Sequence, residues 1–384
     1  MKLQLATSSA VGIAVILTGC STSKSDHLPT PMPAQAVETA PPTPAKSANT
    51  ASNPYPDPPA VLPGNGLAQH DFLYTCEWDT RKTNATLFLV KGGKVVWTYQ
   101  IPRKDEFNGQ ESEFSDMHRL SNGDIVFAYK TGWRKIDAEG KTIFDYRCPR
   151  LTDTNGEVRL DARGNPLWTE CHSAQPIGND KVLFMRNGTP AKLCLYNLKT
   201  GEMEMEHVVQ TKNPNDVRVH AQFRNVRMTK ARTYLLAHLD MGKVVEYDQD
   251  WNVIWSTTNA SSVWQAVRLP NGNTMISGNQ HAWVREVNPA GDIVWEVKNG
   301  DLPGIRINSV HECQRLANGD TVICNWTAGV KKTDWPKIVQ LIEVTPDKKV
   351  VWAVNSWTDP DLGPASCIQL LDEPGNDEDR DLLR

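Results

Sequence analysis

The sequence has no surplus of positive charge, and this absence is the first limit on its function. Lysine and arginine number 41, aspartate and glutamate number 45, and the formal net charge at pH 7 is −4. A nucleic-acid-binding domain needs a basic face that neutralises phosphates. The composition therefore excludes a strongly basic nucleic-acid binder, and no nucleic-acid partner is expected.

Short motifs that carry chemistry are absent as well. The chain has no CxxC pair, which excludes zinc-ribbon and thioredoxin-like sites, and no HExxH motif of the metalloprotease type. Long apolar runs are also missing, because the one at the N-terminus is too short to span a membrane as a mature helix. A functional site must therefore be assembled from residues that lie far apart in the sequence.

Residues 1–20, MKLQLATSSAVGIAVILTGC, have the charged start, short apolar run and small residues of a secretory signal peptide. The last four, LTGC, resemble a bacterial lipobox, which implies cleavage before Cys20 and a lipid on the Cys20 thiol. Ser21 at the next position is typical of sorting to the outer membrane. We therefore expect export to the bacterial cell envelope and anchoring to a membrane, the outer one, through Cys20.

Residues 21–66 contain few large apolar side chains and are rich in Pro, Ala, Ser and Thr. Such a segment cannot bury enough surface to fold, so the composition predicts a disordered tether. The folded domain is expected at 67–384, with an acidic, frayed tail at 375–384.

The rest of the chain repeats one pattern. LSNGDIV (120–126), LPNGNTM (269–275) and LANGDTV (316–322) place Asn-Gly between apolar runs, which predicts hairpins because both residues accept a positive φ. A second turn follows, and then an apolar strand that ends in a large side chain able to pack between neighbouring sheets. These end positions are Trp97, Phe144, Met205, Trp255, Trp295 and Trp352.

Repeats about 40 to 60 residues apart with four strands each are typical of propeller blades. Complete sets of strands are predicted to begin near residues 114, 171, 219, 263 and 310. The strands at 72–101 lack an inner partner, and the strand at 366–372 supplies one. The predicted fold class is therefore all-β: a six-bladed propeller of four-stranded antiparallel blades, closed by the C-terminal strand, with seven blades as the alternative.

Exported proteins can form disulfides, and two pairs are candidates. A two-residue turn at 318–319 would place Cys313 opposite Cys324, within bonding range, and buried free thiols are the alternative for this pair. Cys148 and Cys171 could close the loop between the second and third blades.

Long loops precede the inner strands and should share one face of the ring, where function usually lies. They are expected at 102–113, 149–170, 210–218, 298–309 and 355–365. Polar and aromatic side chains recur where the inner strands start, so we expect them to converge on the mouth of the central channel.

The candidate catalytic residues are His172, His220 and His311 at this mouth, together with Arg224, which follows His220 by four residues and is expected about 13 Å deeper along the strand. The candidate ligand-binding residues are His118, Gln175, Gln222, Trp264, Gln265, Gln314 and Arg315. The three catalytic histidines are also candidate ligands of a divalent metal, which imidazole nitrogens hold at about 2.0–2.1 Å. Three interpretations of the histidines stay open: scaffold residues, metal ligands, and a general base or nucleophile.

The repeats LPNGNTMISGNQHAWVREVNPAGDIVWEV and RLANGDTVICNWT resemble the bacterial propeller proteins called PQQ-like, often lipoproteins, and the resemblance spans about residues 67–372. The name implies pyrroloquinoline quinone, but the quinone dehydrogenases carry a disulfide between adjacent cysteines and no two cysteines are neighbours here. The quinone is therefore not expected, no cofactor is predicted, and only a divalent metal stays open. A more distant similarity to arylsulfate sulfotransferases, with channel histidines and an arginine around a sulfohistidine, implies such roles for His172, His220, His311 and Arg224.

We therefore expect a monomeric, lipid-anchored envelope propeller that binds a glycan, a small molecule or an envelope protein at the loop-rich mouth. The alternative is a propeller enzyme, of the polysaccharide lyase or sulfuryl transferase type, that uses His, Arg and Gln side chains of the channel. Analogy of fold alone does not choose between them.

Overall fold

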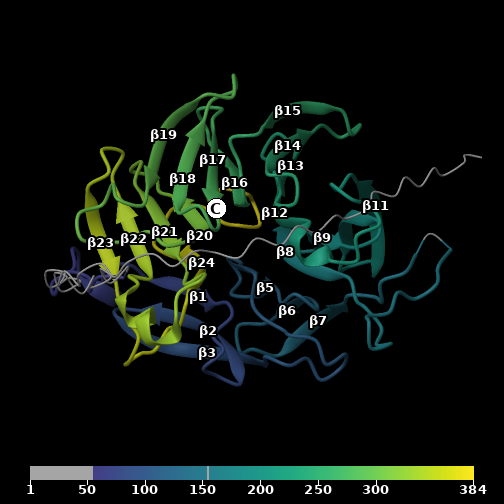
Figure 1. Cartoon of the computed structure of the whole chain (residues 1–384), viewed down its shortest axis with the longest axis horizontal. Coiled ribbons are helices and arrows are strands. Elements are labelled where there is room, and N and C mark those ends of the chain that lie inside the picture. The colour runs from purple at the N-terminus through teal and green to yellow at the C-terminus, as the bar shows by residue number, and fades with distance from the viewer. Residues whose placement is uncertain (1–54, 154) are drawn as a thin grey trace, which may run out of the picture. The chain divides into compact units, whose positions relative to one another are not determined.

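The computed structural model describes residues 55–153 and 155–384, so the predicted signal peptide, Cys20 and most of the predicted tether lie outside the described residues. Within them, the strands form six four-stranded antiparallel sheets arranged around a ring (Figure 1). The inner strands contact one another in the order β24, β4, β8, β12, β16, β20 and back to β24, which closes the ring. The six-bladed fold is confirmed, and the seven-bladed alternative is not observed among these residues.

The blades follow the chain, except that the first takes its inner strand from the C-terminal region. Blade 1 contains β24 (Ala365–Leu370), β1 (Phe72–Cys76), β2 (Asn84–Lys91) and β3 (Lys94–Pro102). Blade 2 contains β4 (Asp116–Arg119), β5 (Ile125–Ala128), β6 (Gly132–Ile136) and β7 (Thr142–Arg147). Blade 3 contains β8 (Glu170–Ile177), β9 (Lys181–Asn187), β10 (Ala191–Asn197) and β11 (Glu202–Val209).

The second half of the ring repeats the same arrangement. Blade 4 contains β12 (Phe223–Met228), β13 (Tyr234–His238), β14 (Lys243–Tyr247) and β15 (Val253–Thr257). Blade 5 contains β16 (Val263–Arg268), β17 (Thr274–Gly278), β18 (Trp283–Val287) and β19 (Ile293–Lys298). Blade 6 contains β20 (Val310–Arg315), β21 (Thr321–Asn325), β22 (Leu341–Val344) and β23 (Val350–Val354). Three short 3-10 helices complete the elements: η1 (Gly66–Ala68), η2 (Val219–Ala221) and η3 (Lys332–Lys337).

Strand position in the blade determines the burial pattern. The inner strand β12 is buried along its whole length, whereas the outer strands β3 and β11 alternate between exposed and partly buried residues. The large side chains on outer strands pack between blades, as predicted. Trp255, for example, donates its indole hydrogen bond to the carbonyl of Pro289 in blade 5, and Trp295 does the same to Pro346 in blade 6.

The hairpin of blade 6 corrects the disulfide prediction. Cys313 pairs with Ile323, not with Cys324, because the loop holds three residues and only Gly319 among them has a positive φ. A register shift of one residue turns each side chain to the other face of the sheet. Cys313 and Cys324 are therefore buried free thiols.

The second disulfide prediction is also wrong. Cys148 and Cys171 are buried in the same apolar cluster as Cys194, and both are free thiols. The loop that they were expected to close is held instead by backbone pairing of its two arms, in which Leu151 bonds to Leu167 and Thr169 bonds to Pro149.

Both ends of the described chain pack against the ring. Before β1, the carbonyl of Pro63 accepts a hydrogen bond from Ala353 and that of Gly66 accepts one from Trp352, so the end of the predicted tether lies along blade 6. Residues 375–384, expected to be frayed, instead lie across the short turns opposite the predicted mouth and end near the centre of the ring (Figure 1). No helix of the described ranges is long and apolar enough to cross a membrane.

Candidate functional site

The loops that precede the inner strands and those that follow the second strands of the blades surround a pocket of about 400 Å³ at one end of the channel. Every blade except the third contributes to the loops or strand ends around it, so several candidate residues lie together on the loop-rich face. The side chains that matter chemically are those of Glu77, Trp78, Glu113, His220, Arg224, Trp264 and Trp326. We call this cavity the mouth pocket.

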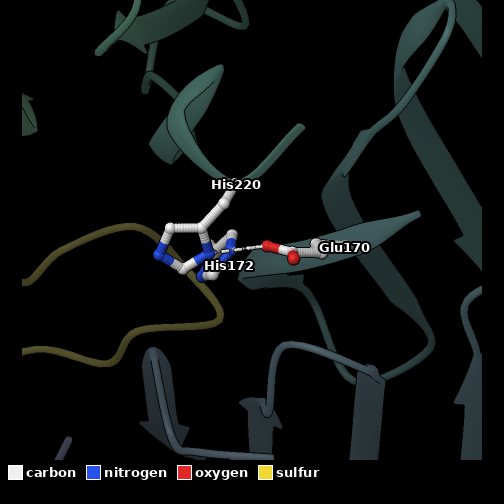
Figure 2. Close-up of side chains that lie close together, drawn as sticks. All are labelled: Glu170, His172 and His220. Atoms are coloured by element: carbon white, nitrogen blue, oxygen red, sulfur yellow. Dashed lines mark hydrogen bonds and ion pairs between the residues drawn. The ribbon is translucent and has the colours of Figure 1, made fainter. Parts of the chain in front are cut away.

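Beside the mouth pocket, one carboxylate joins two of the predicted histidines (Figure 2). Glu170 Oε2 lies 2.8 Å from His172 Nε2 and 2.7 Å from His220 Nδ1, and the two rings meet edge to face with centroids 4.9 Å apart. Glu170 and His172 lie two residues apart on β8, which puts them on the same face of the strand. We call these three residues the His–Glu–His group.

Local structure explains why His220 differs from His172. The sequence predicts a strand from residue 219, but η2 occupies Val219–Ala221 and β12 begins only at Phe223. The side chain of His220 is therefore 49% exposed, whereas that of His172 is 1% exposed. The second ring nitrogen of His220 points away from Glu170, as Figure 2 shows.

Burial and neighbouring charges set the protonation of this group. Burial alone would raise the pKa of Glu170, but hydrogen bonds from His172 and His220 outweigh it and hold that pKa well below its usual range. Burial, together with the positive charge of Arg224, holds the pKa of His172 well below its usual range. At neutral pH, Glu170 is therefore a carboxylate and His172 is a neutral imidazole.

The third predicted histidine, His311, belongs to a different part of the site. Its ring stacks on Trp264 with centroids 3.6 Å apart and on Trp326 with centroids 4.2 Å apart. His311 Nδ1 lies 3.2 Å from Glu77 Oε2, and burial and the charge of Arg224 hold the pKa of His311 well below its usual range. The predicted set His172, His220 and His311 is thus divided, and Glu170 takes the third place beside the first two.

Arg224 connects the two parts. Its guanidinium lies 4.8 Å from the ring centroid of Trp264, and Nη1 donates hydrogen bonds to the carbonyls of His220 and Phe223. The residue is 4% exposed, and within the described residues it forms no ion pair. Burial lowers the pKa of Arg224, and the more distant carboxylates of Glu77 and Glu170 oppose this effect.

Four buried polar atoms in the lining of the mouth pocket, or directly behind it on His311, lack partners among the described residues. Glu113 Oε2, Arg224 Nε, Trp264 Nε1 and His311 Nε2 have no hydrogen-bond partner within the described structure. Burial and the nearby carboxylate of Glu77 raise the pKa of Glu113 to about 8, so Glu113 is mostly protonated at neutral pH. Buried polar groups are almost always hydrogen-bonded in folded proteins, so several exceptions around one cavity need an explanation.

The predicted glutamines do not line the mouth pocket, and their amide groups hydrogen-bond to the backbone of neighbouring blades. The amide oxygen of Gln175 accepts from Met228, that of Gln265 from Cys313 and that of Gln314 from Leu370, in each case across to the next blade. Gln222 makes two bonds to Gly188 of the preceding blade: its amide oxygen accepts from the Gly188 amide, and its amide nitrogen donates to the Gly188 carbonyl.

The remaining predicted residues lie away from the mouth pocket. Arg315 pairs with Glu286 at 3.0 Å near the other end of its strand. His118 Nδ1 lies 2.9 Å from Asp377 Oδ2 inside the channel, where the C-terminal residues meet the inner strands. Neither residue lines the mouth pocket.

Sequence reasoning missed Glu77, Glu113 and Trp326 as members of the site. Glu113 ends one of the long loops, and Glu77 and Trp326 each directly follow a buried strand, β1 and β21. Polar or aromatic residues at strand ends on the loop-rich face were the available signal.

Comparisons with known proteins support the fold. No protein-family model matches the chain, so the resemblance to PQQ-like proteins stays a prediction, and no curated protein matches it. A protein of unknown function from Bacteroides caccae is similar in structure, with a TM-score of 0.62 and 22% identity over 78% of this chain and 97% of that one. A streptogramin B lyase, with 10% identity over 76% and 84% of the two chains, and virginiamycin B lyase from Staphylococcus aureus, with 10% over 76% and 85%, each have a TM-score of 0.44.

Proposed function

We propose that this propeller binds a small ligand with an anionic group in the mouth pocket. The observation that carries the proposal is Arg224, a buried guanidinium at the pocket that, among the described residues, forms no ion pair and has an unpartnered Nε. A buried polar atom without a partner costs about 1–3 kcal/mol, and more when the group is charged. A carboxylate, sulfate or phosphate on a ligand would provide the missing partner.

The other groups around Arg224 favour the same kind of ligand. Trp264 Nε1 is a hydrogen-bond donor without a partner, and the protonated carboxyl of Glu113 can donate as well. Trp78 and Trp326 add flat apolar faces to the lining, which suit a sugar or aryl ring. The proposed ligand is therefore a small ring compound or glycan unit with an acidic substituent.

The cellular setting is part of the proposal. A lipid on Cys20 and a tether before the propeller would hold the mouth pocket at the cell envelope, where the protein would capture its ligand. The sequence LTGC supports this location, and Cys20 lies outside the described residues. Mass spectrometry of the protein from membranes would detect the lipid-modified Cys20 peptide, and an unmodified N-terminus would contradict the anchor.

A second candidate function is catalysis, and His220 favours it. The carboxylate of Glu170 faces Nδ1, so Nδ1 carries the proton of the neutral ring and Nε2 keeps its lone pair. Nε2 points away from Glu170 (Figure 2). His220 also lines the mouth pocket. A carboxylate that orients an imidazole in this way is the arrangement of a general base or nucleophile, as a lyase or sulfuryl transferase would need.

Binding is tested with the full-length protein in detergent and matched ligand pairs. An aryl glucuronide and the corresponding neutral glucoside differ in one carboxylate, and para-nitrophenyl sulfate adds a sulfate probe that also reports hydrolysis. We expect tighter binding of the anionic member, by tenfold or more, and loss of this preference in Arg224→Met. The control Arg218→Met removes an arginine that is 85% exposed and already paired with Asp216, and it should change nothing.

Three results would decide between the candidates. If no anionic probe binds, or if Arg224→Met keeps the preference, the anion-binding proposal is wrong. If product forms and His220→Ala stops it while binding persists, the protein is an enzyme and not only a binding module.

A further inference from the structure

We infer that Glu170, His172 and His220 form a site for a divalent transition-metal ion, with an open coordination position toward the mouth pocket. Each residue offers one ligand atom, and these atoms all lie within 4.8 Å of one another. The sequence suggested three histidines for such a site, but the structure replaces His311 by Glu170. This inference stands on the His–Glu–His group and does not require the proposed anionic ligand.

The ligand set has the composition of an open transition-metal site. Two imidazoles and one carboxylate leave a fourth position free on a four-coordinate ion, as in zinc enzymes whose fourth ligand is water or substrate. Imidazole nitrogen with a single carboxylate favours zinc, cobalt or nickel over magnesium and calcium, which prefer an all-oxygen shell. We therefore assign the site to an ion of the zinc class.

The spacing of the three atoms is compatible with such an ion after a small movement. At metal bonds of about 2.0–2.1 Å, two ligands of a tetrahedral ion lie roughly 3.3 Å apart. Glu170 Oε2 now lies 2.8 Å from one ring nitrogen and 2.7 Å from the other, so each nitrogen must move away from Glu170 by about half an ångström. The two nitrogens lie within 4.8 Å of each other and must also come to about 3.3 Å apart. His220 has room for this movement because its side chain is half exposed and lies on a short 3-10 helix.

The surroundings fix the ring of His172 and leave His220 exposed to the mouth pocket. His172 Nδ1 lies 3.2 Å from the hydroxyl of Ser115, which orients the ring so that Nε2 faces Glu170. Such contacts to the far nitrogen of a metal-binding histidine are usual in metal sites. His220 lines the mouth pocket, so an ion bound here would present its free position to whatever the pocket holds.

Charges near the group act in both directions. The carboxylate of Glu170 attracts a cation, and Glu77 lies on the same side of the molecule. Lys130 Nζ lies 4.0 Å from Glu170 Oε1, and Arg224 is close enough to lower the pKa of His172, so both oppose a cation. We therefore expect the ion to bind more weakly than in a closed structural zinc site. Its binding should still depend on His172 and His220.

The test uses full-length protein freed of metal by chelation and then titrated with Co²⁺ and with Zn²⁺. Calorimetry should give one ion per chain, and Co²⁺ should develop the visible absorption of a four- or five-coordinate ion. His220→Ala and Glu170→Gln should each weaken binding by at least tenfold. Circular dichroism checks that both variants are folded, and His220→Ala is the safer one because the side chain is largely at the surface.

A control variant makes the outcome specific. His281→Ala removes an exposed histidine outside the group and should leave metal binding unchanged. Metal binding is measured without an anionic ligand, and the anion preference is measured on metal-free protein, so the two proposals can fail separately. The inference is overturned if no saturable binding occurs, or if His220→Ala and Glu170→Gln bind the ion as the unaltered protein does.

Discussion

Two buried polar regions lie at opposite ends of the same channel, and they are built in opposite ways. At the far end, Asp116 pairs with Arg227 at 2.9 Å, while Arg384 pairs with Glu312 at 2.8 Å and with Asp377 at 2.6 Å. At the mouth, Arg224 is as well buried but has no ionic partner in the part of the chain that the structure describes. A buried charge that has an ionic partner is therefore explained by the structure alone. A buried charge without a partner in the protein indicates a functional site.

The far end, which we call the channel network, explains the fate of the C-terminal tail. Its members are Asp116, His118, Arg227, Glu312, Asp377 and Arg384. Arg384 also donates to the carbonyls of Ile368 and Met117, so the tail joins two blades at the centre of the ring. Because its charges are compensated, the network acts as structure.

The largest expected effect comes from breaking this compensation. Arg227→Met would leave Asp116 buried without its bidentate partner, and the unfolding free energy should fall by about 3–5 kcal/mol. Urea unfolding followed by tryptophan fluorescence measures the change. Lys230→Met is the control, because its pair with Asp381 is exposed and should contribute less than about 1 kcal/mol. A loss for Arg227→Met no larger than the control would show that the channel network does not stabilise the ring.

A smaller effect is expected from the glutamines between blades. Gln265→Met would leave the buried amide of Cys313 without its acceptor, at a cost of about 1–3 kcal/mol, and ligand binding should not change. The same denaturation series gives the stability, and the glucuronide and glucoside pair gives the binding. Unchanged stability with lost binding would return Gln265 to the ligand-binding role that the sequence predicted.

Lowering the pH should have opposite effects on the stability contributed by His311 near the mouth and by His118 in the channel network. Burial and Arg224 lower the pKa of His311, so below about pH 6.5 the unfolded chain binds a proton that the folded chain does not, and stability falls. Burial alone would lower the pKa of His118, but Asp116 and Asp377 outweigh it and raise that pKa. The contribution of His118 is therefore present at low pH and is lost as the pH rises through the folded pKa.

Two variants separate these signs. Between pH 6.5 and 5.5, His311→Gln should lose less stability than the unaltered protein, by about 1 kcal/mol. His118→Gln should lose more. Unfolding free energies measured at both pH values provide the test, and equal losses in all three proteins would contradict the assigned protonation states.

The smallest effect concerns the cysteines. All seven described cysteines are buried free thiols, so a reducing agent should leave the melting temperature unchanged. Thiol labelling should give seven reactive groups only after unfolding. A melting temperature that drops on reduction would restore the disulfide that the sequence suggested.

The sequence predicted the fold well where a pattern repeats. It predicted contacts poorly where one residue more or less in a loop determines which side chains meet. The Asn-Gly turns and outer-strand tryptophans predicted six blades and their closure by β24, because each repeat adds independent support. The pairing of Cys313 failed, since one more loop residue shifts the register and periodicity does not report loop length. The tail failed for a similar reason: its acidic composition is that of a frayed end, but its charges meet buried partners from distant blades.

The candidate site was predicted in part for the same physical reasons. Strand starts on the loop-rich face predicted His172 and His220 at the mouth, but they predicted Arg224 about 13 Å deeper along its strand. In the structure the 3-10 helix η2 replaces the start of that strand, and Arg224 lines the mouth pocket. His311 has the same position in its blade as His172 and His220, but it does not lie with them. Its ring is held between Trp264 and Trp326. Which side chains contact each other depends on the direction in which each one points toward the neighbouring blade. A single sequence does not give this direction.

The most direct test of the central claim is the unfolding free energy of Arg224→Met, measured without ligand beside Arg227→Met. If the mouth is left unpaired for a ligand, removing the buried cation should leave stability unchanged or raise it by about 1 kcal/mol. A loss of about 3 kcal/mol or more, as for a broken buried pair, would show that Arg224 is already compensated within the protein and would contradict the account.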